Sequence, residues 1–582
     1  MRSFRKALLV LLLGVLPVAA GCAAIPTQTS PIPVNPSAGN ASAVAAPEPV
    51  EGIDPLTLVR EFVNAAANPE NDYAAARAYL TPEAEKTWDT KGAPAIIETT
   101  FNTVPTAAAA DDDDEQRTVL LQGKNVGRLQ LEDNSFVQLL GNLETPIGLQ
   151  RDDQDQWRIS EPPDGIFVPL AGFQQNYRRV TLYFYDQDFG VLVPDPRWVV
   201  VAPSTSIPSR VVNLLLKGPA VGMRGALSTA VPNGAAQRKN TAENDNGALE
   251  VDLTKVGDIT AAAARRIVAQ VVKSLAGVTS SRIRVLVEGQ PISADQEEWR
   301  PADVQTGEAL TTPAAGLTGL LVENRRVRQV NGDPLPGPAG QGAYEVLSAA
   351  QSMDGSQLAV VVRAGASPRL RVGGVQSDLA QVDLVANTLT RPTWLLSGRQ
   401  DEPSSEVWTV VDGTDVVRVI RTDNGWTASA VNASELSLIG KITELRLSRD
   451  GTRVAAVVDG KLIVAAVVRG QDSAVSLRAP RNLQPSVLGT SALSLDWLAQ
   501  DVVVASTSLA AWPIAKVNID GLRIERYNTS NLTVPVGSVT AAPGRNVLAV
   551  DQSGLWSAGD VGDVWRASAT AVAPGTQAFY PG

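Results

Sequence analysis

The chain has 582 residues, 44% of them apolar, with a single cysteine, no histidine and a formal net charge of −11. A chain without histidine cannot use Ser-His-Asp or Cys-His catalysis, nor build most zinc or copper sites. The acidic balance disfavours nucleic acid as a partner. The length predicts three or four domains, and we expect no enzymatic activity, no cofactor and no metal.

The chain begins with a predicted secretory leader. Basic residues at positions 2, 5 and 6 precede the apolar run 7–20, which is too short to cross about 30 Å of hydrocarbon. The small residues 19–21 then stand directly before Cys22. This order resembles the lipobox of bacterial lipoproteins, in which the cysteine carries S-diacylglycerol and N-acyl groups. The resemblance implies a signal peptide at 1–21 and a lipid-anchored protein on the extracytoplasmic face of the cell membrane. The alternative is an ordinary signal peptide with a chance cysteine.

Residues 22–50 predict a disordered tether, because they are rich in Pro, Ala, Ser and Asn and carry almost no charge. Residues 51–170 predict an α+β domain, since helical periodicity gives way to strand-like runs. One helical face is formed by Val59, Phe62, Val63 and Ala66, and the strand-like runs are 118–121, 127–131, 136–140 and 156–159. The order of these elements resembles an NTF2-like cone.

Two further features of this domain carry predictions. Asp72 is expected to cap a second helix that Thr81-Pro82 ends. The acidic run 111–115 supplies oxygen ligands of the kind that calcium prefers. The run lacks the glycine and the spaced ligands of a calcium loop, so a solvated loop is the preferred interpretation.

Residues 171–300 predict an α/β module. A strand at 180–185 is followed by a helix that ends at Gly218-Pro219, a strand at 248–253, a long amphipathic helix and a strand at 283–287. The long helix has one apolar face, formed by Ala264, Ile267, Val268, Val271, Val272 and Leu275. The separated motifs LYFYDQDFGVLVPDPRWV, LLLKGP, VPNG, LEVDL, QVVKSL and IRVLVEGQPI resemble the GerMN domain of secreted proteins. That resemblance implies a role in binding or assembly near the cell wall, and no catalytic residue.

The last region, 341–582, repeats itself. The sequence SMDGSQLA at 352–359 is repeated as SRDGTRVA at 448–455, and a more degenerate repeat occupies 542–549. The five strands of the repeat start at 358, 407, 454, 502 and 547. A spacing of roughly 40–50 residues with Asp-Gly turns is typical of β-propeller blades. Five blades are clear, and we expect a propeller of five to six.

The linker, 301–340, contains a hairpin that turns at residues 323–326 and is expected to pair with the C-terminal strands, which would remove an exposed sheet edge. Six tryptophans recur at blade-like positions. We interpret them as packing residues between blades rather than as stackers of a ligand. They are Trp394, Trp408, Trp426, Trp497, Trp556 and Trp565.

The combination of lipid-anchor signal, α+β domain, GerMN-like module and degenerate propeller resembles the LpqB family of actinobacterial lipoproteins. The family is associated with the MtrAB two-component system, in which it is thought to contact the extracytoplasmic domain of the sensor histidine kinase. The resemblance therefore implies a regulator of cell-wall homeostasis and cell division. Only Cys22 is carried over as a functional residue, with membrane lipid as its partner.

Two other functions stay open at this stage. The first is a lipoprotein that binds or scaffolds a cell-wall polymer without touching a kinase. Exposed tryptophans at the propeller mouth would favour it, and tryptophans buried between blades would favour protein binding. The second is a glycan enzyme with two facing carboxylates. The candidate carboxylates are Asp186, Asp188, Asp354 and Asp450, which are better explained as loop and turn residues.

Overall fold

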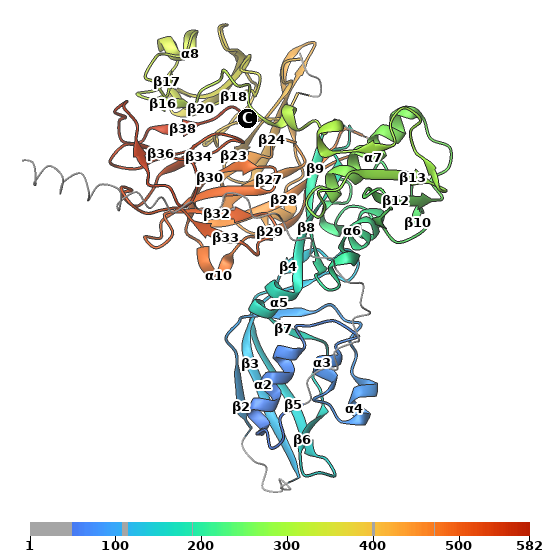
Figure 1. Cartoon of the computed structure of the whole chain (residues 1–582). Helices are drawn as coiled ribbons and strands as arrows, with labels where there is room; N and C mark the ends of the chain where they lie inside the picture. Colours follow the sequence, from blue (N-terminus) through green and yellow to red (C-terminus); the bar gives the residue numbers. More distant parts are fainter. Residues whose placement is uncertain (1–48, 107–114, 189, 398–401, 471) are drawn as a thin grey trace, which may run out of the picture. The chain divides into compact units, whose positions relative to one another are not determined.

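The computed structural model describes residues 49–106, 115–188, 190–397, 402–470 and 472–582 (Figure 1). Residues from Glu48 to Gly582 form one compact unit. Cys22, the leader and nearly all of the tether lie outside the described residues. Within the described part of the chain, the helices are too short or too polar to span a bilayer.

The N-terminal module packs short helices against one face of a mainly antiparallel sheet (Figure 1). Its helices are α2 (Pro55–Ala65), α3 (Ala74–Arg77), α4 (Pro82–Thr87) and α5 (Leu170–Asn176). Its strands are β1 (Ala95–Ile97), β2 (Asn102–Pro105), β3 (Gln116–Leu129), β4 (Phe136–Gln138), β5 (Asn142–Arg151), β6 (Trp157–Glu161) and β7 (Phe167–Pro169). The sheet order is β6-β5-β3-β1-β7, and β2 and β4 also pair with β3. The likeness to an NTF2-like cone stays a prediction.

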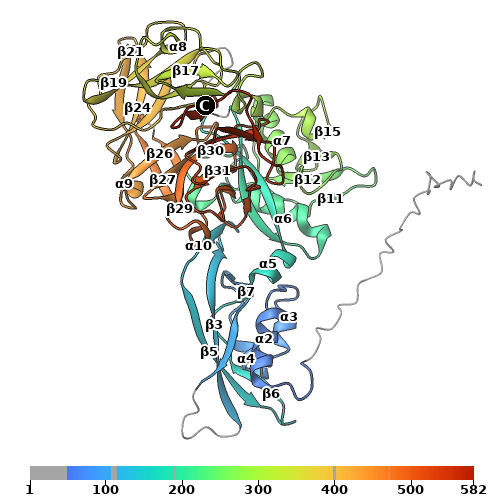
Figure 2. The ribbon, with the colours of Figure 1, turned by 90° about the vertical axis from the view of Figure 1, so that its left-hand side faces the viewer.

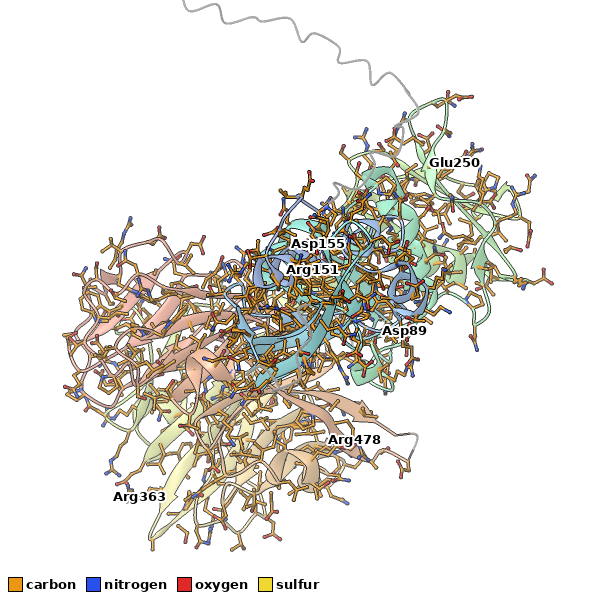
Figure 3. The ribbon with its side chains drawn as sticks, turned by 90° about the horizontal axis from the view of Figure 1, so that it is seen from below. Asp89, Arg151, Asp155, Glu250, Arg363 and Arg478 are labelled. Atoms are coloured by element: carbon orange, nitrogen blue, oxygen red, sulfur yellow. The ribbon has the colours of Figure 1, made fainter. Side chains whose placement is uncertain are left out.

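Helix α2 follows from its sequence. The Asp54 carboxylate accepts hydrogen bonds from the backbone N–H groups of Leu56 and Thr57 at 3.1 Å, and Pro55 occupies the first turn. The predicted apolar face is buried in the core of the module: Val59, Phe62, Val63 and Ala66. At the far end of the sheet, Arg151 and Asp155 form an ion pair that joins the ends of the β5–β6 turn (Figure 3).

Two local predictions in this module were wrong. Asp72 lies in a left-handed turn and does not cap a helix; its carboxylate instead pairs with Arg77 at 2.7 Å. Thr81 does not end a helix but begins α4, accepting a hydrogen bond from Ala84 N at 3.2 Å. The runs 118–121 and 127–131 fall mainly within one long strand, β3, because β5, which was not predicted, pairs along most of its length.

The GerMN-like module consists of an antiparallel strand pair and a small mixed sheet with two helices. The pair is β8 (Tyr177–Tyr185) and β9 (Leu192–Val200). The helices are α6 (Ile207–Leu216) and α7 (Ala261–Leu275). The sheet contains β10 (Ala236–Gln237), β11 (Ala242–Glu243), β12 (Leu249–Thr254), β13 (Ile283–Val287), β14 (Gln290–Pro291) and β15 (Glu298–Trp299).

Helix α7 links the parallel strands β12 and β13, as crossover helices do. Thr260 caps it by accepting a hydrogen bond from Ala263 N at 3.2 Å. The predicted apolar face of this helix is buried. It packs in a core shared with α6, β8, β9, β12 and β13, so the sequence pattern correctly predicted how the helix is oriented.

The C-terminal region forms five four-stranded sheets and one three-stranded sheet among the described residues (Figure 2). The first two four-stranded sheets are β18 (Val346–Gln351), β19 (Gln357–Ala364), β20 (Ser367–Gly374), β21 (Ala380–Gln381) and β22 (Thr393–Trp394), β23 (Glu406–Val411), β24 (Asp415–Thr422), β25 (Gly425–Ala430). The next two are β26 (Ile442–Leu447), β27 (Arg453–Val458), β28 (Lys461–Arg469), β29 (Val475–Asn482) and β30 (Ala492–Ala499), β31 (Val502–Thr507), β32 (Ile514–Asn518), β33 (Ile524–Arg526). The fifth is β34 (Ser538–Thr540), β35 (Val547–Val550), β36 (Leu555–Ala558), β37 (Arg566–Ala567).

The three-stranded sheet joins two distant parts of the chain. The hairpin of β16 (Leu320–Glu323) and β17 (Arg326–Gln329) turns at Asn324 and Arg325, which both have positive φ. Strand β16 then pairs antiparallel with β38 (Gln577–Phe579) near the C-terminus. The expected pairing of this hairpin with the C-terminal strands is therefore present.

Candidate functional site

A cavity of about 1250 Å³ lies between the GerMN-like module and the first propeller sheets. One wall is the exposed side of α7, with Arg265 and Arg266, next to Tyr185 at the end of β8. The opposite wall is formed by the turn around Met353 and by Leu395 and the residues near it. Because parts far apart in the sequence meet here, no sequence motif predicted the cavity.

A connecting segment, residues 303–314, forms the third wall and is held at both ends. Leu192 of β9 donates to Thr306 O at 2.8 Å, and Ala314 donates to Met353 O at 3.2 Å. Gly307 has a φ of 67°, and a Cβ there would overlap the Gly190 carbonyl oxygen. Only glycine fits this close approach, so the segment is tightly seated against the turn that joins β8 to β9.

The chemistry of the cavity is mixed. The lining contains charges of both signs, from Arg265, Arg266, Asp303, Asp354 and Glu402. Its apolar surface comes from Trp299, Met353, Leu310, Leu395 and Leu396. The Tyr185 hydroxyl donates to Arg266 O at 3.2 Å, and burial raises the pKa of Tyr185 to about 12. A lining that combines apolar surface with charges of both signs is suited to a protein segment.

Strand β9 connects this site to the rest of the molecule, and nearly all of it is buried. Its Trp198 belongs to the core of the N-terminal module, where its ring lies 4.9 Å from that of Phe173. Trp198 N also donates to Asn134 O at 3.0 Å. On the propeller side, Arg453 donates to Pro194 O at 2.8 Å. One strand therefore contacts all three modules (Figure 1).

Ion pairs strengthen the contact between β8 and the propeller. Arg179 donates to Asp520 at 2.8 Å and to Asp501 at 2.9 Å. Burial alone would lower the pKa of Arg179, but the two carboxylates outweigh it and raise that pKa. Ala466 and Val468 of β28 also pack against the core of the GerMN-like module. Sequence analysis missed these residues, because neither an arginine nor a β-strand valine signals its partner.

The structure gives three of the four carboxylates of the enzyme hypothesis local structural roles. Asp186 accepts hydrogen bonds from Gly190 N at 2.7 Å and Val191 N at 2.9 Å, which closes the β8–β9 turn, and burial raises its pKa. Asp450 accepts from Thr452 N at 2.9 Å in the turn between β26 and β27. Asp354 makes the equivalent contacts in the turn between β18 and β19. Asp188 is exposed. The acidic run lies outside the described residues except for Glu115.

The tryptophans of the repeat are mainly buried. Trp394, Trp408, Trp497 and Trp565 are at most 2% exposed, whereas Trp426 and Trp556 are half-buried. Two of them reach across to the preceding sheet: Trp394 Nε1 donates to Ala350 O at 2.9 Å and Trp497 Nε1 to Arg446 O at 3.1 Å. The four buried indoles therefore pack between sheets, as the sequence analysis expected.

Comparison with known proteins identifies the family to which nearly the whole chain is similar. The model "Lipoprotein LpqB, N-terminal domain" matches residues 48–174, and "Lipoprotein LpqB beta-propeller domain" matches 319–581. Lipoprotein LpqB of Rhodococcus jostii is 33% identical over 91% of this chain and 90% of its own length. The chain belongs to the LpqB lipoprotein family. Lipoprotein LpqB of Mycolicibacterium smegmatis is 30% identical and covers 99% of this chain and 100% of its own length.

The middle module has separate matches. The family model "Sporulation and spore germination" covers residues 181–293. The tandem GerMN domains of the sporulation protein GerM from Bacillus subtilis match 23% of this chain and 48% of their own, at 18% identity and a TM-score of 0.19. A β-propeller domain of Cps50 (Swd1) matches 43% of this chain and 72% of its own, at 12% identity and a TM-score of 0.27.

Proposed function

We propose that this LpqB-family chain is anchored by lipid on Cys22 at the extracytoplasmic face of the cell membrane. The leader and the small residues before Cys22 support this anchor, and so does the lipoprotein family. Mass spectrometry of the protein purified from its native membrane tests it. The expected product starts at Cys22 and carries the mass of S-diacylglycerol and an N-linked acyl chain. An unmodified thiol or a retained leader would refute the anchor.

We further propose that the anchored protein modulates the sensor kinase of an MtrAB-type two-component system by direct contact. Membership in the LpqB family over nearly the whole chain carries this proposal. The buried indoles support protein binding over sugar stacking, because four of the six blade tryptophans offer no face to a glycan. Acylation would confine both proteins to one thin layer, in which even a weak contact is substantially occupied.

The cavity beside α7 is the contact surface that we propose for the kinase. A photo-crosslinking amino acid placed at Ala262 or Arg265, which are exposed and line the cavity, should capture the kinase in living cells. Matched controls are Val385 and Leu438, which are 81% and 88% exposed and do not line it. Equal capture from all four positions would refute the assignment of this surface. Capture of glycan alone would favour the wall-polymer function instead.

A separate experiment tests whether the effect on signalling depends on confinement to the membrane. A Cys22→Ala variant at native abundance should lose its effect on signalling, because the local concentration near the kinase falls. Fusing the same variant to a transmembrane helix should restore the effect. Normal signalling by the unanchored variant would contradict the confinement argument while leaving the contact itself open to the crosslinking test.

We also infer that the six C-terminal sheets form one six-bladed ring. The first strands of successive sheets contact one another in the order β18, β22, β26, β30 and β34, and β38 contacts both β34 and β18. The sheet made from both ends of the region would then close the ring. Deletion of residues 576–582 should therefore destabilise the propeller far more than removal of an exposed tail would.

A further inference from the structure

A second cavity, of about 270 Å³, lies where the three modules meet. Strand β4 contributes from the N-terminal module, β9 and residues 220–223 from the GerMN-like module, and β28 and β29 from the propeller (Figure 1). Much of the wall is apolar, including Phe136, Val137, Met223, Val464 and Ala465. The volume lies just below the roughly 300–1,000 Å³ of typical ligand pockets, so only a small molecule fits.

Arg453 brings unpaired hydrogen-bond donors to this cavity. Its side chain lines the wall and the residue is 1% exposed. The Nη2 atom donates to Pro194 O at 2.8 Å, but Nε and Nη1 are buried and have no hydrogen-bond partner among the described residues. Buried charges in proteins are normally paired, because an unpaired one has lost its hydration without replacement.

The carboxylates in the wall already have other partners. Asp195 accepts from Arg197 Nη2 at 2.9 Å and from Ala220 N at 2.9 Å. Asp520 accepts from Arg179 at 2.8 Å. Burial alone would raise the pKa of Asp195, but its arginine neighbours outweigh this and hold that pKa below the usual range. Both carboxylates therefore accept their arginine hydrogen bonds from Arg197 and Arg179, whereas Arg453 acts on Asp195 through its charge.

A second arginine adds to the excess of positive charge. Arg481 lines the same cavity and donates to Ile519 O at 3.2 Å. Burial, and then repulsion by Arg453, lower the pKa of Arg481. Asp520 and Asp195 oppose this lowering, but burial and the nearby guanidinium groups outweigh them.

We propose that the junction cavity binds a small organic anion, with its carboxylate or phosphate group at Arg453 Nη1 and Arg481 and a compact apolar body against β4 and β28. An oxyanion would neutralise the excess charge and accept the unused N–H groups. Because all three modules supply walls, the ligand would stabilise their packing against one another. The site is separate from the larger cavity beside α7, so it does not depend on the proposed kinase contact.

Thermal unfolding of the full-length protein in detergent tests the site. The probes are acetate, butyrate and inorganic phosphate, added at constant ionic strength and balanced with a bulky sulfonate too large for the cavity. A ligand that binds only the folded state raises Tm in a saturable way. We expect butyrate to act at lower concentration than acetate, because its chain contacts the apolar wall. No saturable shift with any probe would overturn the proposal.

Variants separate the site from general salt effects. Arg453→Met should lower the affinity for the tightest-binding probe about tenfold or more, as expected when a charge-assisted hydrogen bond is lost. If that variant does not fold, Arg481→Gln should have the same effect. Arg446→Gln is the matched control. Arg446 is also a buried propeller arginine, but it is paired with Glu444 at 2.8 Å and lies outside the cavity lining. An unchanged response in the cavity variants would overturn the proposal, as would a crystal structure with the probe bound elsewhere.

Discussion

Replacing Arg179 tests how the GerMN-like module is held against the propeller. The guanidinium pairs with Asp520, whose side chain is 3% exposed, and with Asp501, whose side chain is 21% exposed. Breaking a buried pair leaves an uncompensated charge and costs about 3–5 kcal/mol, whereas an exposed pair contributes about 1 kcal/mol or less. Arg179 is itself 24% exposed. We therefore expect Arg179→Met to cost about 3 kcal/mol, chiefly through the stranded Asp520.

A double-mutant cycle isolates this pair. If the cost comes from the uncompensated carboxylate, Asp520→Asn should restore much of the stability lost in Arg179→Met, with a coupling energy of about 2 kcal/mol. The assay is amide hydrogen exchange in the full chain, read on peptides from β8 and β32, which report local opening where a global unfolding curve of three modules does not.

Arg178→Met is the control, because Arg178 is the exposed neighbour in the same strand and donates instead to Gly277 O at 2.7 Å. It should leave exchange in β32 unchanged. Additive effects of the two substitutions at Arg179 and Asp520, within about 0.5 kcal/mol, would refute the reasoning. Equal exchange in the Arg178 and Arg179 variants would also refute it, because the contact of Arg179 with the propeller would then contribute no stability.

Three further outcomes follow from single residues. Burial opposes ionisation of Asp551, but donors that include Trp556 Nε1 at 3.0 Å outweigh it and lower the pKa of Asp551. The stability from this carboxylate is thus present above about pH 4 and lost as pH falls through the lowered pKa. Asp551→Asn should cost about 2 kcal/mol near pH 7 and flatten the acid side of a Tm–pH curve. Trp497→Phe should cost about 2 kcal/mol, measured by chemical unfolding, because Arg446 O loses its donor and indole volume is lost. Gly307→Ala should lower Tm and speed proteolysis within the connecting segment, since a Cβ there meets backbone.

The propeller could be predicted well because its information is local. Three blades repeat an Asp-Gly or similar turn followed by an apolar strand, the other two keep only the strand, and the spacing is nearly constant. The predicted strand starts lie within one residue of the second strand of each four-stranded sheet, namely β19, β23, β27, β31 and β35. Gly355 and Gly451 have φ of 78° and 74°, as the turns require. Helices with a clear apolar face were predictable for the same reason.

Strand β9 shows what the sequence could not reveal. Its segment contains two prolines and the charged residues Asp195 and Arg197, a composition typical of an exposed edge. The structure instead buries the strand between segments that are distant in the sequence. Its partner Asn134 lies in the preceding module, and its partner Arg453 follows it by more than two hundred positions. Burial of a charged strand depends on these distant partners, and no local pattern encodes them. The two cavities were unpredictable for the same reason.

Strand β9 contributes to both proposed sites, so binding at one is expected to influence the other. The strand donates through Leu192 to the segment that walls the larger cavity, and through Asp195 it lines the smaller one. An anion that tightens the packing around Asp195 would also restrain the segment at Thr306, because Leu192, three residues before Asp195 in β9, donates to Thr306 O. By linkage, a partner that binds the larger cavity only in its ordered form would then bind more tightly with the anion present, and the anion more tightly with the partner. Crosslinking from Arg265 should therefore increase when the preferred anion is added, and Arg453→Met should abolish that increase without abolishing the crosslink itself.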